Sequence, residues 1–482
     1  MRHVAKPTAQ PTRDTGGKNA GSDVPGWLPV LLMGVFLAAA ARQGVRVISD
    51  PDAFWHLRLG HDIIDARSVS SITGPWSSLS DQPWVPTQWL SEVLLALAED
   101  VGGLPAVALL FTTTLLVLVL LVHRLARRVA DPVPAAFATG LTVLAMSASL
   151  SPRPHMVTYV LLCATLAAWL RTADDLRPRW WLVPLTWIWA MSHGMWFIGP
   201  VVGLTVLAGL CLDRRVERAD ALRLLAIPVA SAVSAALTPV GPGLLGAPLA
   251  VAGVGAYITE WQPPSFREPG PAAAALMVGL VVVVWGRSTR QVAWTHVALL
   301  VLAAGWVVLA TRTVALGALI VAPLAAGVLQ ELLHRDHRSP ERRETWSLWL
   351  IALAVACISA FVVPGSAADP ARVPSGLNGQ LDDLADGSVV YNAYELGGWL
   401  RWRHPDLEPV VDGMTEAYSV AHLGDFGRVQ AVAAEWQGTF DGWRPAAALV
   451  LDRSPLATAL TEQRGWTSVA EDGGYVLLVP SP

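Results

Sequence analysis

Apolar runs of about 16 to 20 residues recur through most of the chain, and short arginine-bearing segments separate them. Because about 20 helical residues cross about 30 Å of hydrocarbon, this repeat is typical of helices that span a bilayer. Only 15% of the 482 residues are charged, whereas soluble domains carry about 25%. The sequence therefore predicts a polytopic α-helical membrane protein and argues against a soluble one.

Eleven membrane spans are predicted where apolar runs lie between polar breaks. They cover 27–47, 104–122, 133–150, 155–170, 180–194, 196–212, 221–238, 271–286, 292–309, 312–330 and 346–363. The segment 180–212 must make two short spans beside five tryptophans, and a re-entrant pair is the alternative there.

The arginines orient these spans, because cytoplasmic loops of membrane proteins carry an excess of Lys and Arg. If 1–26 is a disordered cytoplasmic tail, every arginine-rich loop falls on the cytoplasmic side: HRLARR, RTADDLRPR, DRRVERADALR, GRSTR and LHRDHRSPERR. The opposite side receives the first outer loop, 48–103, the segment 239–270 and all of 364–482. We expect these three segments to face the periplasm or the cell exterior.

Charge divides the chain into two parts. Residues 1–363 hold 27 basic and 22 acidic side chains, whereas 364–482 hold 7 and 16. In the second part, strand-like pieces such as SVVYNAY and AAALVLD alternate with helix-like pieces such as HLGDFGRVQAVAAEW. The sequence predicts a transmembrane domain over 27–363 and a small extracytoplasmic α/β domain over 364–482. An acidic terminal domain without a basic stripe argues against a nucleic-acid partner.

The first outer loop opens with SDPDAFWHLRLGHDIIDA, which is dense in ionisable side chains. Asp52 and His56 are spaced i, i+4, so on a helix they share a face and could ligate a divalent cation such as Mg²⁺ or Mn²⁺. Arg58 adds a hydrogen-bond donor for a substrate. The alternative is an ordinary helix start, in which Asp50 caps the helix and Pro51 takes its first position.

Further ionisable residues lie at the predicted outer ends of other spans: Arg153, His155, His193, Glu260 and Arg312. Charged groups at membrane depth are costly and usually pair or face a polar cavity, so their gathering at one boundary predicts a site. Alternatively, a single histidine is a packing residue and an arginine snorkels to the interface. Most tryptophans near this boundary fit an aromatic belt. We except Trp55 and Trp261, which flank the candidate acids, and Trp261 is a candidate binding residue.

Two segments of the outer domain, YNAYELGGWLRW and PVVDG, are predicted to present polar side chains toward the membrane. These side chains are Asn392, Glu395 and Asp412, and we expect them to contact substrate. The glycine pair at 397–398 allows close approach of another backbone. The alternative is that both segments only terminate strands of a structural domain.

The chain resembles a family of large bacterial polytopic membrane proteins that look like the GT-C superfamily of glycosyltransferases. The resemblance spans most of 27–420 and rests on DPDAFWHLRLG, PWVPTQWLSE, SPRPHMVTY, SHGMWFIG, ITEWQPPSF, RTVALGALIVAPL, and YNAYELGGWLRW followed by PVVDG. It implies a GT-C-like transmembrane domain in the bacterial plasma (inner) membrane. It also implies a sugar donor linked to polyprenyl phosphate.

In GT-C enzymes a carboxylate just after the first span serves as base or metal ligand, and by resemblance this role falls on Asp50 or Asp52. The chain departs from the family pattern at two places. Members often have His-Glu before the WL of the second motif, where this chain has Thr87-Gln88, and Arg after the DG, where it has Met414. Glu92, one turn further along, is a candidate substitute for the missing acid.

These observations predict a glycosyltransferase that moves a sugar from a lipid-linked donor to a glycan, lipid or protein acceptor of the cell envelope. The predicted catalytic carboxylates are Asp50, Asp52 and Glu260. The predicted substrate-binding side chains are His56, Arg58, Arg153, His155, His193, Trp261, Arg312, Asn392, Glu395 and Asp412. The rival hypothesis is a non-catalytic membrane protein that binds, moves or scaffolds lipid-linked glycan.

Overall fold

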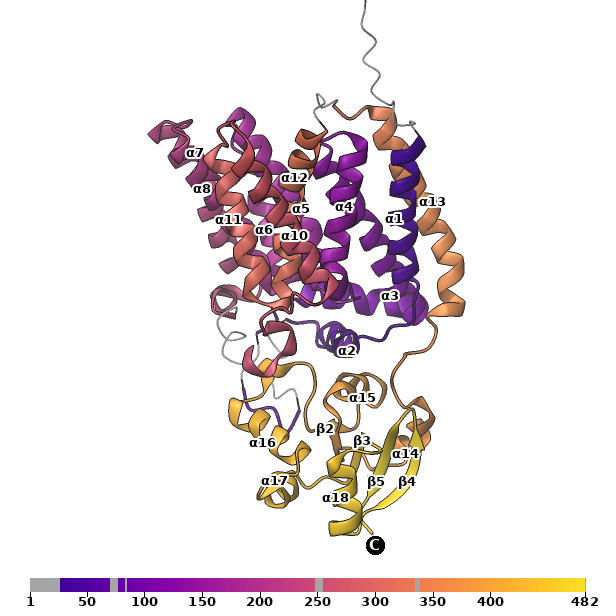
Figure 1. Ribbon diagram of the computed structural model, residues 1–482. Coiled ribbons are helices and arrows are strands. Elements are labelled where there is room, and N and C mark those ends of the chain that lie inside the picture. The colour runs from indigo at the N-terminus through magenta and orange to yellow at the C-terminus, as the bar shows by residue number, and fades with distance from the viewer. Residues whose placement is uncertain (1–26, 70–76, 83–84, 248–254, 334–338, 482) are drawn as a thin grey trace, which may run out of the picture.

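The computed structural model describes residues 27–69, 77–82, 85–247, 255–333 and 339–481. The predicted cytoplasmic tail, 1–26, lies outside the described residues. A helical bundle occupies one part of the molecule and a small sheet domain the other (Figure 1). The polytopic fold class predicted from the sequence is confirmed.

Each predicted span coincides with a helix of the bundle. Within the described residues, nine helices are long and apolar enough to cross a membrane, and two shorter apolar helices, α6 and α11, accompany them. The bundle consists of α1 (Trp27–Gly44), α3 (Trp89–Ala126), α4 (Pro132–Met146), α5 (His155–Asp175), α6 (Leu182–Ser192), α7 (Ile198–Leu212), α8 (Arg218–Ala236), α10 (Pro269–Arg287), α11 (Trp294–Leu309), α12 (Val314–Leu332) and α13 (Arg342–Ser366).

Helix α3 begins well before its predicted span. It has 38 residues and a kink, where Gly102 and Gly103 leave helical geometry and Gly103 takes a φ of 63°. Pro105 follows directly and lacks the amide hydrogen that would continue the hydrogen-bond ladder. The kink therefore separates a membrane helix from an initial helical segment that belongs to the first outer loop.

The segment 180–212 forms a hairpin of a short helix and a longer one. Helix α6 has 11 residues and is about 16 Å long, which is short for about 30 Å of hydrocarbon. A 3₁₀ turn over Gly194–Phe197 joins it to α7. His193 lies at this turn in extended geometry.

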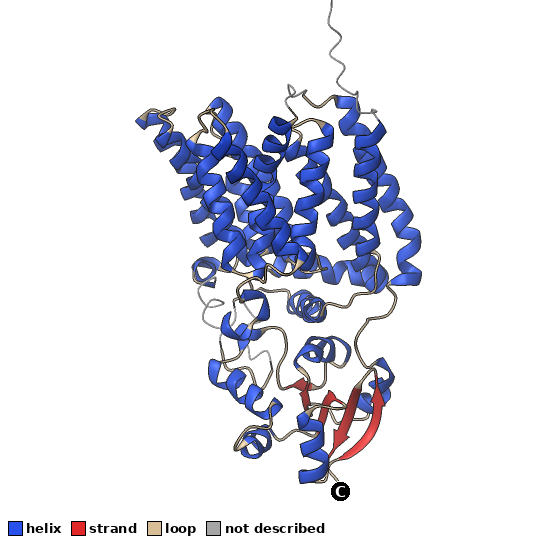
Figure 2. Ribbon diagram, in the orientation of Figure 1, coloured by secondary structure: helices blue, strands red, loops and turns tan. Residues whose placement is uncertain are grey.

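The C-terminal domain is built on one five-stranded sheet in the order β2-β1-β3-β5-β4, shown in red in Figure 2. Neighbours β2, β1 and β3 pair in parallel, whereas β5 pairs antiparallel with both β3 and β4. The strands are β1 (Val389–Asn392), β2 (Glu408–Pro409), β3 (Ala447–Leu451), β4 (Thr467–Asp472) and β5 (Tyr475–Val479). Its helices are α14 (Asn378–Asp382), α15 (Gly397–Arg403), α16 (Val420–Gln430), α17 (Trp436–Trp443) and α18 (Pro455–Arg464).

The predicted single helix HLGDFGRVQAVAAEW is wrong in one respect. Helix α16 ends at Gln430, and a separate helix, α17, begins at Trp436. Between them Val432 and Glu435 have φ values of 51° and 63°. Left-handed geometry at two non-glycine residues interrupts the helix, which a regular apolar pattern cannot reveal.

Helix α2 (Pro51–Ala66) lies between the bundle and the sheet domain (Figure 1). Trp55, Leu59 and Ile63 belong to a core cluster with residues of the sheet domain, including Tyr391. Phe54 and Leu57 belong to a second cluster shared with the sheet domain and α3. Burial on both sides therefore fixes α2, and with it the start of the first outer loop, between the two parts of the molecule.

Candidate active site

Asp50 and Asp52 are positioned by the first turn of α2. Asp50 is the N-cap, and its Oδ1 accepts a hydrogen bond of 3.0 Å from the backbone amide of Asp52. Pro51 occupies the first helical position. The ordinary helix start considered above is therefore present. Asp50 also makes a contact outside the helix start, because its Oδ2 lies 3.0 Å from Nε of Arg153.

Arg153 is the centre of the site. It lies in the turn just before α5, and its side chain is only 9% exposed. Besides Asp50, its Nη1 lies 2.5 Å from Oδ2 of Asp52, and its Nη2 pairs with Oε1 of Glu260. One guanidinium thus contacts three carboxylates that are up to 210 residues apart in the sequence.

Glu260 links this centre to a second arginine. Its Oε2 lies 3.0 Å from Nη1 of Arg312. The two short 3₁₀ turns that carry these residues, Thr259–Trp261 and Thr311–Thr313, are tied by a 3.0 Å hydrogen bond from the amide of Thr311 to the carbonyl of Gln262. Nη2 of Arg312 lies 3.4 Å from Nε2 of His193, which brings the α6–α7 turn to the same place.

The charges of these five groups do not cancel. Three carboxylates face two guanidinium groups, so the cluster carries a net negative charge when all of them are ionised. Burial raises the pKa of Asp52 to about 6, since the opposing attraction of Arg153 is offset by repulsion from Asp50 and Glu260. Burial also acts on Glu260, but Arg153 and Arg312 together hold its pKa below the usual value. Asp52 is therefore the carboxyl that exchanges a proton near neutral pH.

Arg153 itself stays charged. Its burial disfavours the cation, but Asp52, Asp50 and Glu260 together hold its pKa above that of an ordinary arginine.

The three predicted histidines line the same region with different partners. His56 is buried, and its Nδ1 lies 2.9 Å from Oε1 of Glu92, which is itself fully buried. Burial and the nearby Arg153 lower the pKa of His56, so its ring is neutral. His155 Nε2 lies 2.6 Å from the carbonyl of Ser149, and the rings of His155 and His193 are 6.3 Å apart.

Several buried polar atoms of this region have no hydrogen-bond partner in the described part of the chain. They are Nε1 of Trp261, Nδ1 of His155 and Oε2 of Glu92. Buried polar groups in folded proteins are nearly always satisfied by protein, water or ligand. Donors and acceptors of this kind suit a hydroxyl-rich ligand.

Four predicted binding residues are not brought into this cluster. Arg58 pairs with Asp62 at 2.9 Å along α2. Glu395 accepts a 3.0 Å hydrogen bond from the Tyr475 hydroxyl in the sheet domain. The two remaining residues, Asn392 and Asp412, are fully buried.

Asn392 and Asp412 both contact other groups of the sheet domain, and Oδ2 of Asp412 lies 3.7 Å from Nε of Arg401. Asn392 donates to the carbonyls of Ala393 and Val411, each at 2.9 Å, and accepts from the amide of Val410 at 2.9 Å. Asp412 accepts from the amide of Met414 at 2.9 Å. The backbone thus uses both the donors and the acceptor of the Asn392 amide group, and its contact with a substrate stays a prediction.

Sequence reasoning passed over Glu416. This half-buried residue lies in a 3₁₀ turn over Thr415–Ala417. Burial raises its pKa, Arg312 opposes that rise, and Asp52 and Asp412 reinforce it. The sequence offers one signal for this residue, an acid three residues after the DG motif.

The sheet domain touches the site through two glycines. A Cβ at Gly413 would lie 2.1 Å from Oδ1 of Asp52, and one at Gly398 would lie 2.7 Å from the carbonyl of Pro51. Real side chains never approach so closely, so both positions require glycine as the structure stands. The backbone of the PVVDG segment is therefore directly against the carboxylate of Asp52.

The residues as arranged do not fit a metal ion. A divalent cation needs several oxygen ligands around one point, and no three His, Cys, Asp or Glu side chains of the described ranges are placed to hold one. Of the two predicted ligands, Asp52 pairs with Arg153 and His56 with Glu92. A cation of the protein itself already lies among the carboxylates.

Comparison with solved structures bears on the fold. The chain is 13% identical to the oligosaccharyltransferase AglB from Archaeoglobus fulgidus, which was solved with an inhibitory peptide and a dolichol-phosphate. The TM-score is 0.57, and the match covers 88% of this chain and 69% of AglB. It is also 16% identical to ArnT from Cupriavidus metallidurans, solved in the apo state. The TM-score is 0.54, and the match covers 95% of this chain and 99% of ArnT. Both are GT-C glycosyltransferases. The chain therefore shares the fold of these two proteins.

A second structure of the Archaeoglobus enzyme, in complex with Zn and sulfate, gives a TM-score of 0.54 at 13% identity over 87% of this chain and 68% of that one. No protein-family model and no curated protein matches the chain. In this fold the cluster around Arg153 lies where the helical bundle meets the sheet domain, beside α2 (Figure 1).

Proposed function

We propose that the chain is a membrane glycosyltransferase that moves a sugar from a polyprenyl-phosphate-linked donor to an acceptor outside the cytoplasm. The observation that carries this proposal is the convergence of Asp50, Asp52 and Glu260 on Arg153, with Arg312 beside them, in a GT-C fold. AglB, which shares the fold, was solved with dolichol-phosphate and a peptide. A lipid phosphate and an acceptor are therefore the two ligands that this site must accommodate.

The orientation supports an extracytoplasmic site. Arg124 lies in the last turn of α3, Arg127 and Arg128 follow that helix, and Arg342 begins α13. These helix ends lie opposite the sheet domain (Figure 1). Because an excess of basic residues marks the cytoplasmic side, the Arg153 cluster and the sheet domain face outward. We place the protein in a bacterial plasma membrane with residues 364–482 outside.

The chemistry assigns Asp52 as the general base. Its carboxylate takes the proton of an acceptor hydroxyl as the hydroxyl oxygen bonds to the anomeric carbon and the bond from that carbon to the phosphate oxygen breaks. Polyprenyl phosphate leaves with the electron pair of the broken bond. A pKa of about 6 leaves Asp52 mostly ionised at neutral pH yet basic enough to accept the proton.

The leaving phosphate needs positive charge, and Arg312 is the better placed of the two arginines. Arg153 contacts carboxylates at Nε, Nη1 and Nη2, whereas Arg312 contacts one carboxylate at Nη1. We propose that Arg312 and His193 bind the phosphate while Arg153 holds the carboxylates in place. Positive groups aimed at the developing charge lower the transition-state energy.

We propose that transfer does not depend on a bound divalent cation. The guanidinium of Arg153 takes the position among the carboxylates that a Mg²⁺ or Mn²⁺ ion would need. This proposal differs from the metal site predicted at Asp52 and His56, and chelation tests it.

The acceptor is expected to enter from the sheet-domain side. Gly413 and Gly398 bring the backbone of that domain against α2 and Asp52. An acceptor hydroxyl that reaches Asp52 must therefore pass the PVVDG segment. Glycan, lipid and protein acceptors of the envelope all carry suitable hydroxyl or amine groups.

The test is a deletion strain complemented with the wild-type gene, with Asp52→Asn, or with Asp65→Asn. Asp65 lies on the same helix, is exposed, and serves as the matched control. Mass spectrometry of lipid extracts should show a polyprenyl-phosphate sugar that accumulates in the deletion and in the Asp52→Asn strain, but not with Asp65→Asn. If Asp52→Asn restored the parental lipid profile, the protein would be a non-catalytic binder or scaffold of lipid-linked glycan.

A further inference from the structure

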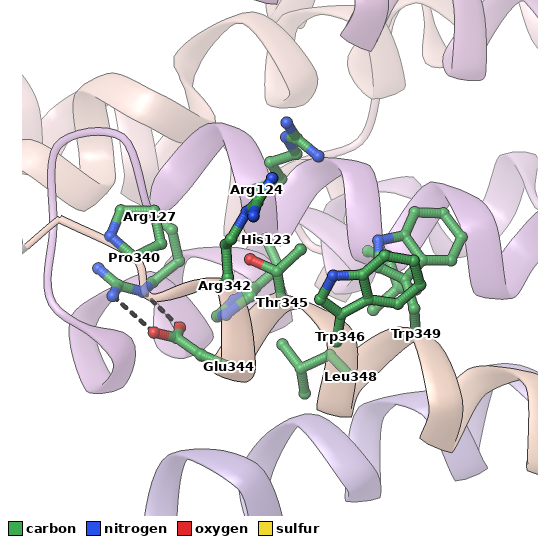
Figure 3. A pocket seen from close by; sticks show the side chains of 11 residues that line it. His123, Arg124, Arg127, Pro340, Arg342, Glu344, Thr345, Trp346, Leu348 and Trp349 are labelled. Atoms are coloured by element: carbon green, nitrogen blue, oxygen red, sulfur yellow. Dashed lines mark hydrogen bonds and ion pairs between the residues drawn. The ribbon is translucent and has the colours of Figure 1, made fainter.

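A cavity lies between the end of α3 and the start of α13 (Figure 3). This end of the bundle is opposite the sheet domain (Figure 1). The volume of the cavity is about 520 Å³. Its charged lining residues are Arg124, Arg127, Arg342 and Glu344. It shares no residue with the Arg153 cluster and plays no part in the proposed transfer.

One of these arginines is already neutralised. Arg127 is 3% exposed and forms a two-pronged ion pair with Glu344, with Nε to Oε1 at 2.7 Å and Nη2 to Oε2 at 2.8 Å. Its Nη1 donates to the carbonyl of Ala130 at 2.5 Å. This pair, marked by dashed lines in Figure 3, ties the end of α3 to the start of α13.

Arg124 and Arg342, unlike Arg127, have no carboxylate partner in the described chain. Both are exposed, and no hydrogen bond or ion pair joins either of them to the rest of the described chain. Glu344 is the single carboxylate among the described lining residues, and Arg127 occupies both of its oxygens. The cavity therefore carries two uncompensated positive charges, which suit a phosphate group.

The opposite wall of the cavity is apolar and continues onto the outer surface of the bundle. Trp346 and Trp349 lie side by side on α13 in Figure 3, and Trp346 is 68% exposed. Leu350, Leu353 and Phe361 continue the face of Trp346 along the helix and are also exposed. A face of this kind on a membrane helix contacts acyl chains, and interfacial tryptophans lie at headgroup level.

We propose that this cavity binds the headgroup phosphate of an anionic phospholipid from the leaflet on the arginine-rich side of the membrane. Arg124 and Arg342 contact the phosphate from α3 and α13, and the acyl chains follow the exposed face of α13 from Trp346. A free phosphate or sugar phosphate would satisfy the arginines but not the apolar face. The lipid bridges two helices, so its binding stabilises the attachment of α13 to α3.

The experiment uses full-length protein purified in detergent, with native mass spectrometry to measure binding of phosphatidylglycerol and phosphatidylcholine. The test variant is Arg124→Gln with Arg342→Gln. The matched control is Arg290→Gln with Arg343→Gln, which removes the same charge from exposed positions outside the cavity. We expect phosphatidylglycerol to bind the test variant at least tenfold more weakly than wild type, and the control within twofold of wild type.

Two further measurements keep the proposal open to refutation. Phosphatidylglycerol should raise the melting temperature of wild type and control but not of the test variant, and phosphatidylcholine should raise none. Equal binding of phosphatidylglycerol by test and control variants would overturn the site. Displacement of the lipid by millimolar glycerol 3-phosphate would show a site for soluble phosphates instead. If the double variant does not fold, each single variant must weaken binding at least threefold.

Discussion

The two ends of the helical bundle use arginine in opposite ways. At the sheet-domain end, Arg153 is 9% exposed and contacts three carboxylates. At the other end, Arg124 and Arg342 are exposed, and the described chain offers them no partner. The difference teaches that the carboxylates of the protein itself use the positive charge of Arg153, whereas the positive charges of Arg124 and Arg342 are available to other molecules.

Replacement of Arg153 should give the largest effect. Arg153→Gln leaves three carboxylates without their central cation, and breaking a buried ion pair in this way costs about 3 kcal/mol or more. Transfer should fall by about 100-fold or more, because Asp52 and Glu260 lose their common anchor. Thermal unfolding and a transfer assay in detergent measure both.

The comparison variant is Arg342→Gln without added anionic lipid. Its arginine is exposed and unpaired in the described chain, so its unfolding free energy should change by no more than about 0.5 kcal/mol. Equal losses of stability in the two variants would contradict the contrast between the two ends.

The pH dependence of transfer should follow Asp52. A base must be ionised to accept a proton, so with a pKa of about 6 the rate should fall as the pH drops below 6, about tenfold per pH unit. The Asp65→Asn control should keep this profile. The residual transfer rate of Asp52→Asn should not fall in this way below pH 6.

The raised pKa of Asp52 affects folding stability in the opposite direction to activity, because low pH favours folding but slows transfer. Because the folded state binds this proton more tightly than the unfolded chain does, Asp52 favours folding below its ordinary pKa of 3.8, and this contribution is lost as the pH rises through about 6. Asp52→Asn should therefore be at least as stable as wild type at pH 7. A large loss of stability at that pH would show that Asp52 serves mainly as a partner of Arg153.

Contact between the sheet domain and the site can be tested at Gly413. The Cβ of Gly413→Ala would lie 2.1 Å from Oδ1 of Asp52, so the two must separate. We expect about a tenfold loss of transfer, since small displacements of catalytic groups are costly. The control is Gly427→Ala on α16, where a Cβ would meet nothing within 4 Å. An unchanged transfer rate in Gly413→Ala would show that the PVVDG segment has no role in transfer.

Metal removal should give the smallest effect at the Arg153 end. If the guanidinium supplies the positive charge among the carboxylates, EDTA treatment followed by desalting should leave transfer within twofold of its starting rate. Loss of activity that Mg²⁺ or Mn²⁺ restores would mean that the carboxylates release Arg153 to bind a metal.

The membrane fold was readable from the sequence because hydrocarbon imposes a simple rule. A helix that crosses it must be apolar over nearly its full length, so each of the eleven predicted spans has a matching helix. The start of α2 was readable for a similarly local reason, since Asp50 and Pro51 act within one turn. The left-handed residues between α16 and α17 could not be predicted from the sequence, because isolated changes of backbone geometry leave no periodic signal.

The sequence by itself predicted that six residues gather at one boundary of the membrane: Asp50, Asp52, Arg153, His193, Glu260 and Arg312. Only the tertiary structure decided how they pair. It placed Arg153 among three carboxylates, joined His56 to Glu92 instead of to Asp52, and enclosed Asn392 in backbone hydrogen bonds. Depth in a membrane depends on local hydrophobicity, which each segment carries alone. Pairing depends on the packing of helices far apart in the chain, which no single segment encodes.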